Sequence, residues 1–508
     1  MNLNKHINHF KTALIIVAIT AALTGCKKEF LTDPQPTDAV SGTDVFKSKD
    51  GVHSYFTGIY RNMRSQWQNL ETPPTAGNST DAWGYNSVNA ARVNKGIDII
   101  NPGGWYQFDY RHENREPTYR RTIFTWGFFY EVINQANVII EGVAKSATIA
   151  ESDKKTLTAE ARALRGWLYF ELIREFQHTI LKDPNAPGIP IYTVPTSLDN
   201  KGAPRGTVKA VYDLINSDIA FATQNLSSTR ILKNEINLQV AWGMAARIAL
   251  EQARWAEAKD AAIKARVGYA LDASGYRDGY TDLSSPEVIW GFPQTQENGG
   301  QTLYYGTPSS FYEKTGNGYD NFFAASTLVS MFTATDIRNN FFLSSATPTS
   351  SARYSTNKFG IPGNDDIDLT TGEIVKLKET DFNESLPMMR TAEMYLIEAE
   401  AKAELADATA GNILYAVQKN RDTSAIKSGN TGAALVSEIL IERRKEFYGE
   451  LGMDYLDIKR RQLPLVRAGN HPAAYRFNMP ANDNRLIMKI PQKEIDSNDF
   501  IAPADQNP

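Results

Sequence analysis

The apolar residues of this chain recur at spacings of three and four over long stretches, and this pattern constrains the fold more than any other feature. Such a spacing places them along one face of an α-helix, whereas a half-buried strand would need strict alternation. The sequence therefore predicts a mostly α-helical protein whose helices each bury one face. The longest such stripe, which has Glu and Arg between its apolar positions, is Leu157, Ala161, Leu164, Leu168, Leu172 and Phe176.

Further segments with the same spacing predict a series of helices. Two of them begin after a residue whose hydroxyl can cap a helix, Ser48 and Thr207. Another holds two alanine-rich helices joined near Gln252-Ala253-Arg254. Small alanines let helices approach closely, which indicates helix pairs of the tetratricopeptide kind (TPR-like). The segments are 52–63, 126–140, 208–219, 238–267, 388–403 and 435–451.

Two long stretches, 65–118 and 268–387, lack this period and are dense in Gly, Asn, Ser, Thr and Tyr. Irregular segments of this length are unusual in a compact domain unless they have a function. We expect loops there with a few short strands, for example over Val288–Phe292. The sequence thus predicts a helical scaffold that carries functional loops.

The N-terminus predicts an exported, lipid-anchored protein. Two lysines precede an apolar run over 13–23 that is too short to span a membrane and is typical of a signal peptide. The run leads into Leu23-Thr24-Gly25-Cys26, with small residues before the cysteine, as a lipoprotein signal peptidase requires. Cys26 is the only cysteine among 508 residues, so it is the predicted lipidation site. We expect removal of residues 1–25 and acyl chains on Cys26 that hold the protein at a membrane.

Composition and motifs argue against nucleic-acid binding and against catalysis. The net charge is −4 and no basic block follows the N-terminal segment, so nucleic acid has no electrostatic partner here. Phosphate-binding loops, zinc-protease motifs and serine-hydrolase elbows are absent from the sequence. The densest charge run, Glu442-Arg443-Arg444-Lys445-Glu446, indicates an ion-pair network on one helix rather than a catalytic carboxylate pair. We therefore predict no enzymatic activity and no cofactor.

One acidic segment has an alternative interpretation as a metal site. Asn364-Asp365-Asp366-Ile367-Asp368 with Gly372 and Glu373 is similar to a calcium-binding loop, but its glycine falls one position late for an EF-hand. A looser calcium site stays an alternative.

Aromatic residues gather in the two loop-rich stretches among Gly, Asn and Ser. An exposed ring can stack on the C–H face of a sugar while neighbouring amides and carboxylates bind the hydroxyls. The alternative is that the rings only pin the loops to the scaffold. The predicted ligand-binding platform consists of Trp83, Tyr85, Trp105, Tyr304, Tyr305, Tyr312 and Tyr319.

Four segments, in order behind Cys26, resemble the SusD/RagB family of outer-membrane nutrient-binding lipoproteins. The resemblance runs nearly end to end, and its motifs fall on predicted scaffold positions rather than on the loops. The segments are AEARALRGWLYF at 159–170, RTAEMYLIEAEA at 390–401, ERRKEF at 442–447 followed by Gly452, Asp457 and Arg460, and the stretch from IPQKEI at 490–495 to QNP at 506–508.

The resemblance implies a SusD-like fold, TPR-like helix pairs with a loop-rich ligand-binding portion, and no catalytic role. It also implies that the protein faces the cell surface at the outer membrane and delivers oligosaccharides to a SusC-like, TonB-dependent transporter. Peptides, as in the RagB branch, are the alternative ligand, and a surface-anchored hydrolase is a remote alternative. We expect a tether over 26–45 and one domain over 46–508, divided near residue 230 into an N-terminal portion (46–230) and a C-terminal portion (231–508).

Overall fold

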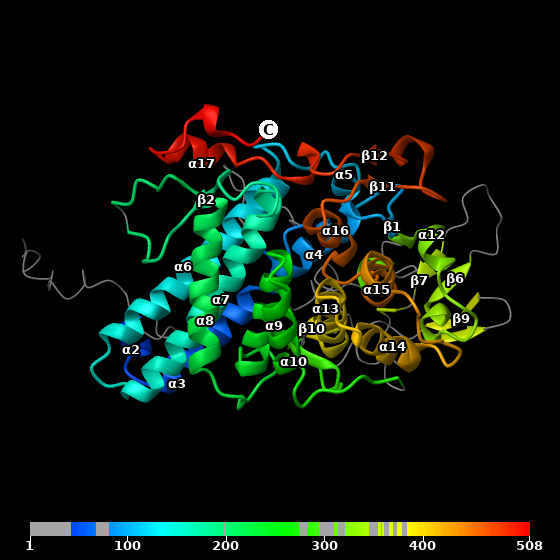
Figure 1. The fold of residues 1–508 in the computed structure, drawn as a ribbon. Helices are drawn as coiled ribbons and strands as arrows, with labels where there is room; N and C mark the ends of the chain where they lie inside the picture. Colours follow the sequence, from blue (N-terminus) through cyan, green and yellow to red (C-terminus); the bar gives the residue numbers. More distant parts are fainter. Residues whose placement is uncertain are drawn as a thin grey trace, which may run out of the picture.

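The computed structural model is mostly helical with few short strands, as the sequence predicts (Figure 1). None of the helices in its described ranges has both the length and the hydropathy of a membrane span. The predicted signal peptide and Cys26 lie outside those ranges. The structure describes residues 42–67, 81–197, 199–273, 283–293, 309–312, 321–344, 354–356, 358–359, 365–368, 373–377 and 384–508.

The helices of the N-terminal half begin where the sequence predicts caps. The Ser48 hydroxyl accepts a hydrogen bond from the N–H of Gly51 at 3.1 Å, and the Thr207 hydroxyl accepts one from Ala210 at 3.0 Å. The predicted junction of two alanine-rich helices is also confirmed, with Ala253 at φ 53° between them. These helices are α2 (Gly42–Val45), α3 (Lys49–Asn62), α4 (Gly84–Lys95), α5 (Gln107–Tyr110), α6 (Arg120–Lys145), α7 (Glu151–Phe176), α8 (Val208–Asn225), α9 (Leu238–Glu251) and α10 (Trp255–Ala265).

Two helices of the C-terminal half are shorter than predicted. Met388 lies in a strand, and the helix begins at Thr391. The helix predicted over 435–451 ends at Glu446, because the chain then turns through positive φ at Gly449 and Leu451. The helices are α11 (Ser309–Tyr312), α12 (Ser326–Val329), α13 (Thr391–Glu404), α14 (Ala410–Arg421), α15 (Gly432–Glu446), α16 (Met453–Arg460) and α17 (Gln492–Ser497).

The strands are short and form small antiparallel sheets. The predicted strand over 288–292 is confirmed as β4, with all five residues buried, and it pairs with β10 so that Leu386 faces Phe292. The largest sheet has the order β1-β5-β7-β6. The strands are β1 (Ile99–Ile100), β2 (Pro187–Pro190), β3 (Arg205–Thr207), β4 (Val288–Phe292), β5 (Phe323–Ala324), β6 (Phe342–Ser344), β7 (Tyr354–Thr356), β8 (Asp365–Asp368), β9 (Glu373–Leu377), β10 (Leu386–Arg390), β11 (Leu465–Val466) and β12 (Asn478–Met479).

Neighbouring helices pack against one another in sequence order, as TPR-like pairs do. Contacts join α6 to α7, α7 to α8, α9 to α10 and α13 to α14, while α10 packs on α13 and so connects the two halves (Figure 1). The predicted stripe of α7 is buried along its whole length. On the same helix, the Trp167 ring meets Trp290 of β4 edge to face, with centroids 4.9 Å apart. Helix α7 is therefore central to the core.

The prediction of loops throughout 65–118 is wrong for α4. All twelve residues of this helix are buried, including its asparagines and Lys95. A helix enclosed on every side needs no amphipathic stripe, since no face meets water. Its Asn-rich sequence consequently shows no period that sequence analysis could detect.

Candidate ligand-binding surface

Three of the predicted ligand-binding rings lie in the interior. Trp83 and Tyr85 are 2% exposed, and Tyr312 is 3% exposed. Since a ring needs an open face to stack on a sugar, the expectation that these three belong to an exposed platform is wrong. Outside the described residues lie Tyr304, Tyr305 and Tyr319.

The buried Tyr85 hydroxyl is hydrogen-bonded to polar groups of α4 and α7. The hydroxyl donates to the Glu171 carboxylate at 2.7 Å, and Arg92 donates to the hydroxyl at 3.2 Å. The ring packs on Trp167, with centroids 5.1 Å apart. Burial, followed by the Glu171 charge, raises the pKa of Tyr85 above its ordinary value. Tyr85 is thus a neutral donor inside the scaffold.

Tyr312 and Trp83 also hold loops in place. The Tyr312 ring lies 4.7 Å from that of Phe359 and 6.1 Å from that of Tyr448, centroid to centroid. Trp83 precedes α4, and its backbone N–H donates to the Ser87 hydroxyl at 2.7 Å. For Tyr312, the alternative interpretation of a ring that pins a loop describes the observed packing.

Trp105 is the one predicted ring that the described residues leave partly open to solvent. It follows a Gly-Gly turn in which Gly104 has φ +93°, a conformation that favours glycine. The side-chain amides of Asn101 and Asn321 donate to the Trp105 carbonyl at 2.7 and 2.9 Å. These bonds fix the backbone under a half-buried ring, so Trp105 is held in place at the surface.

The structure adds residues to this surface that sequence analysis missed. Phe108, three positions further along, is 55% exposed. The Arg111 guanidinium lies 4.9 Å from the centroid of the Tyr475 ring and 5.9 Å from that of Phe108. The sequence signal for Phe108 was its place in an aromatic run directly after two glycines. We call Trp105, Phe108, Arg111 and Tyr475 the Trp105 surface.

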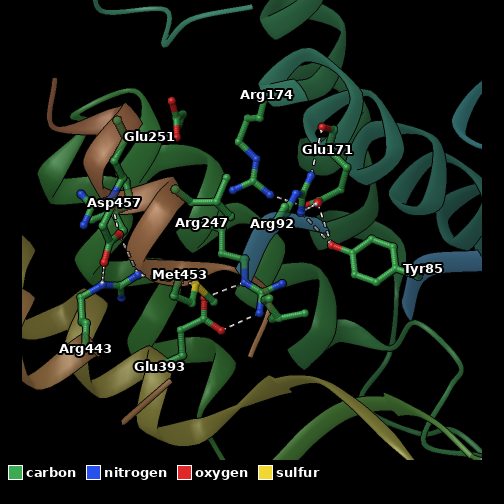
Figure 2. Close-up of a pocket in the computed structure, with 14 residues that line it drawn as sticks. Tyr85, Arg92, Glu171, Arg174, Arg247, Glu251, Glu393, Arg443, Met453 and Asp457 are labelled. Atoms are coloured by element: carbon green, nitrogen blue, oxygen red, sulfur yellow. Dashed lines mark hydrogen bonds and ion pairs between the residues drawn. The ribbon is translucent and has the colours of Figure 1, made fainter. Parts of the chain in front are cut away.

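A charged cavity of about 30 Å³ lies between α4, α7, α9, α13, α15 and α16 (Figure 2). Arg247 donates to Glu393 at 2.7 Å, and Arg443 donates to Asp457 at 2.6 Å. Burial opposes ionisation of Glu171, but Arg174 and Arg92 outweigh it and lower the pKa of that carboxyl to about 2. The volume is far below the several hundred Å³ of small-molecule sites. This cavity is therefore part of the scaffold.

The sequence predicted that the charge run at the end of α15 would form an ion-pair network on one helix, but the partners of Glu446 lie on other elements. The Glu446 carboxylate accepts from Arg390 at 2.8 Å and from Arg421 and Arg338 at 3.0 Å. Burial alone would raise its pKa, but these three guanidinium groups hold it well below its usual range. The motif around Glu446 thus joins α15 to β10, to α14 and to the turn that holds Arg338.

The acidic segment considered for calcium forms a hairpin. Strands β8 and β9 pair antiparallel, with Asp368 opposite Glu373. Among the residues that the structure describes, no group of three or more His, Cys, Asp or Glu side chains is arranged to hold a metal ion.

Comparisons with known proteins agree with this architecture. Residues 29–250 match a SusD-like family described as "Starch-binding associating with outer membrane", and residues 333–508 match the SusD family. A curated SusD-like protein from Bacteroides ovatus is 23% identical over 254 residues, which are 48% of this chain and 40% of that relative. The match thus spans less than half of the relative's length.

Solved structures share the fold. A SusD-like carbohydrate binding protein from Bacteroides vulgatus superposes with a TM-score of 0.77 at 23% identity, over 90% of this chain and 98% of its own. A laminarin binding SusD-like protein gives 0.68 at 22% identity, over 91% and 99% of the two chains. With family matches in both halves and this shared architecture, the chain belongs to the SusD/RagB family.

Proposed function

We propose that this protein binds oligosaccharides at the Trp105 surface. The observation that carries the proposal is a half-buried tryptophan, whose backbone carbonyl is fixed by two asparagine amides, three positions before a phenylalanine that is 55% exposed. Flat rings of this kind suit the apolar C–H faces of sugars. The family's description as starch-binding and the laminarin-binding relative support a glycan as the ligand class.

The test is isothermal titration of the purified protein against a panel of soluble glucans, xylans, mannans and galactans. Trp105→Ala should weaken binding about fivefold, since one ring contact is worth about 1 kcal/mol. Trp255→Ala is the matched control, because Trp255 is also half-buried but lies on the scaffold helix α10. Binding of a glycan that neither Trp105→Ala nor Phe108→Ala changes would place the site elsewhere. Binding of peptides alone would reject the ligand class.

We further propose that the protein has no catalytic role of its own. Carboxylates of the two buried networks, such as Glu171 and Glu446, are neutralised by arginines and are not poised as acid and base. Prolonged incubation of the purified protein with a glycan that it binds should release no reducing ends. Their release at a rate proportional to protein concentration would contradict the proposal.

We also propose a lipid anchor on Cys26 and delivery of the ligand to a SusC-like, TonB-dependent transporter. The support is the sequence Leu23-Thr24-Gly25-Cys26 and membership of the SusD/RagB family. Cys26→Ala should move the protein from the membrane fraction to the soluble fraction, with the wild-type protein as control. A TonB-dependent barrel should co-purify with the wild-type protein from mild detergent. Unchanged fractionation of the variant would reject the anchor.

A further inference from the structure

A second concave site lies away from the Trp105 surface, between α6, the segment that follows β2, and α17. Its volume is about 350 Å³, within the range of small-molecule sites and sufficient for one or two sugar rings. In Figure 1, α17 lies at the same end of the molecule as β2 and the adjoining end of α6. The residues that carry the argument are Trp126, Tyr130, Asn134, Tyr192, Asn200 and Glu494.

Three aromatic rings wall this pocket. The Trp126 and Tyr130 rings have centroids 4.8 Å apart and planes inclined by 54°, and the Tyr130 and Tyr192 rings lie 5.6 Å apart at 77°. Rings at such angles cannot all stack on one face of a ligand. One ring can therefore lie under a sugar while the others enclose its sides.

A carboxylate is held at one side of the pocket. Glu494 accepts from the Trp126 indole N–H at 3.2 Å through one oxygen and from the Asn498 amide at 2.7 Å through the other. Each carboxylate oxygen can accept two hydrogen bonds. Glu494 thus keeps the capacity to accept from the hydroxyls of a bound molecule, in a position fixed by two donors.

Two amides add the complementary donors. The oxygen of Asn134 accepts from the backbone N–H of Thr196 at 2.8 Å, and that of Asn200 accepts from Gly202 at 2.9 Å. Within the described part of the chain, the NH₂ group of neither side chain donates to a partner. Both groups are available to donate to a ligand oxygen.

Hydrogen bonds hold the wall of the pocket opposite α17 in place. Asn137 of α6 donates to the carbonyls of Tyr192 and Val194, at 3.1 and 3.2 Å, and accepts from Arg165 at 2.8 Å. Burial, followed by the charge of Glu494, raises the pKa of Tyr192 to about 12, so its hydroxyl stays protonated. The pocket is consequently built before any ligand arrives, which lowers the entropic cost of binding.

We propose that this pocket is a second sugar site, which takes one or two neutral sugar residues. Rings for the C–H faces, a carboxylate that accepts from vicinal hydroxyls and amides that donate to them together match a neutral pyranose. The Glu494 charge disfavours acidic sugars, because a second carboxylate would meet it in a partly desolvated site. The inference extends the proposed glycan-binding function, but its residues are separate from the Trp105 surface.

The experiment is saturation-transfer NMR and titration of the purified protein with glucose, galactose, mannose, xylose and N-acetylglucosamine. Sodium glucuronate and tetramethylammonium chloride are the charged probes. At least one neutral sugar should bind, and Tyr192→Ala should weaken it about fivefold. Asn200→Ala, a change at an exposed residue that leaves the core intact, should also weaken it. Trp105→Ala should leave this binding unchanged.

Each outcome decides the proposal. Loss of binding in Tyr192→Ala or Asn200→Ala, with wild-type binding in Trp105→Ala, supports it even if the polymers fail to bind at the Trp105 surface. Sugar binding that only Trp105→Ala weakens assigns the sugar to the other surface and overturns the second site. Binding of tetramethylammonium in preference to every sugar overturns the ligand class, because three rings and a carboxylate can also hold a cation. Absence of binding by every neutral sugar overturns the proposal outright.

Discussion

The cavity of Figure 2 and the pocket beside α17 are both lined by aromatic and polar side chains, but they differ more than tenfold in volume, about 30 against about 350 Å³. In the cavity, Arg92, Arg247 and Arg443 each bind a carboxylate directly. In the pocket, amides take the place of the arginines and Glu494 is the carboxylate. The arginine–carboxylate pairs bring their side chains into contact, so the cavity stays small. The neutral amides of the pocket fix its wall and leave its volume open.

The comparison predicts that substitutions in the cavity change the free energy of unfolding, whereas substitutions in the pocket change ligand affinity. A charge in the closed cavity has lost its water and depends on its partner, so removal of one partner is costly. A polar group at the open pocket keeps solvent on one side, so its removal should change ligand affinity more than folding. Variants of residues in the cavity and in the pocket test this prediction.

The largest effect is expected for Arg92→Leu. This change leaves Glu171 and Glu175 without the guanidinium that binds both, and the side chains of all three are at most 2% exposed. The free energy of unfolding, measured by urea denaturation, should fall by about 4 kcal/mol. Lys209→Leu, which breaks the exposed pair with Asp213, is the control and should cost less than about 1 kcal/mol. Equal losses would show that burial does not set the strength of these pairs.

A smaller difference is expected between two tyrosines. Tyr85→Ala removes a ring that is 2% exposed together with its bond to Glu171, and should cost about 3 kcal/mol. Tyr130→Ala removes a half-buried ring whose hydroxyl donates to the Pro190 carbonyl, and should cost about half as much. The two variants are compared by thermal unfolding and by sugar titration. Loss of neutral-sugar binding in Tyr85→Ala, but not in Tyr130→Ala, would reverse the assignment of closed and open sites.

These two tyrosines also show how far the sequence predicts the molecule. The spacing of Trp126, Tyr130, Ile133 and Asn137 predicted α6 correctly. All four residues also line the pocket, because helical spacing identifies one face of a helix but not what that face contacts. Tyr85 belongs to α4, whose enclosure by other helices removes the period altogether. The caps at Ser48 and Thr207 are local and were predictable. Partners hundreds of residues apart, such as Trp126 and Glu494, carry no local signal.

The last of these effects concerns a buried carboxylate that no arginine binds among the residues that the structure describes. Glu160 of α7 accepts from the Tyr60 hydroxyl at 2.8 Å, and burial raises its pKa to about 7. Because its pKa in the folded state lies above the unfolded value, its contribution to stability is complete below about pH 4.5 and is lost as the pH rises through 7. His178 and His471, whose pKa values burial lowers to about 3 and 4, act in the opposite sense below pH 6.5, so the wild-type profile alone is ambiguous.

Comparison of wild type with Glu160→Gln isolates this carboxyl. Glutamine keeps the shape and the acceptor for Tyr60 but does not titrate. Relative to wild type, the variant should gain about 2 kcal/mol of unfolding free energy between pH 5 and pH 8, measured by urea denaturation at each pH. Glu171→Gln is the contrasting variant, because Arg174 and Arg92 keep the pKa of Glu171 near 2 and its relative stability should not change over this range. A parallel pH dependence of the two variants would mean that arginine pairing does not distinguish the buried carboxylates, and the physical basis of the contrast between the two sites would fail.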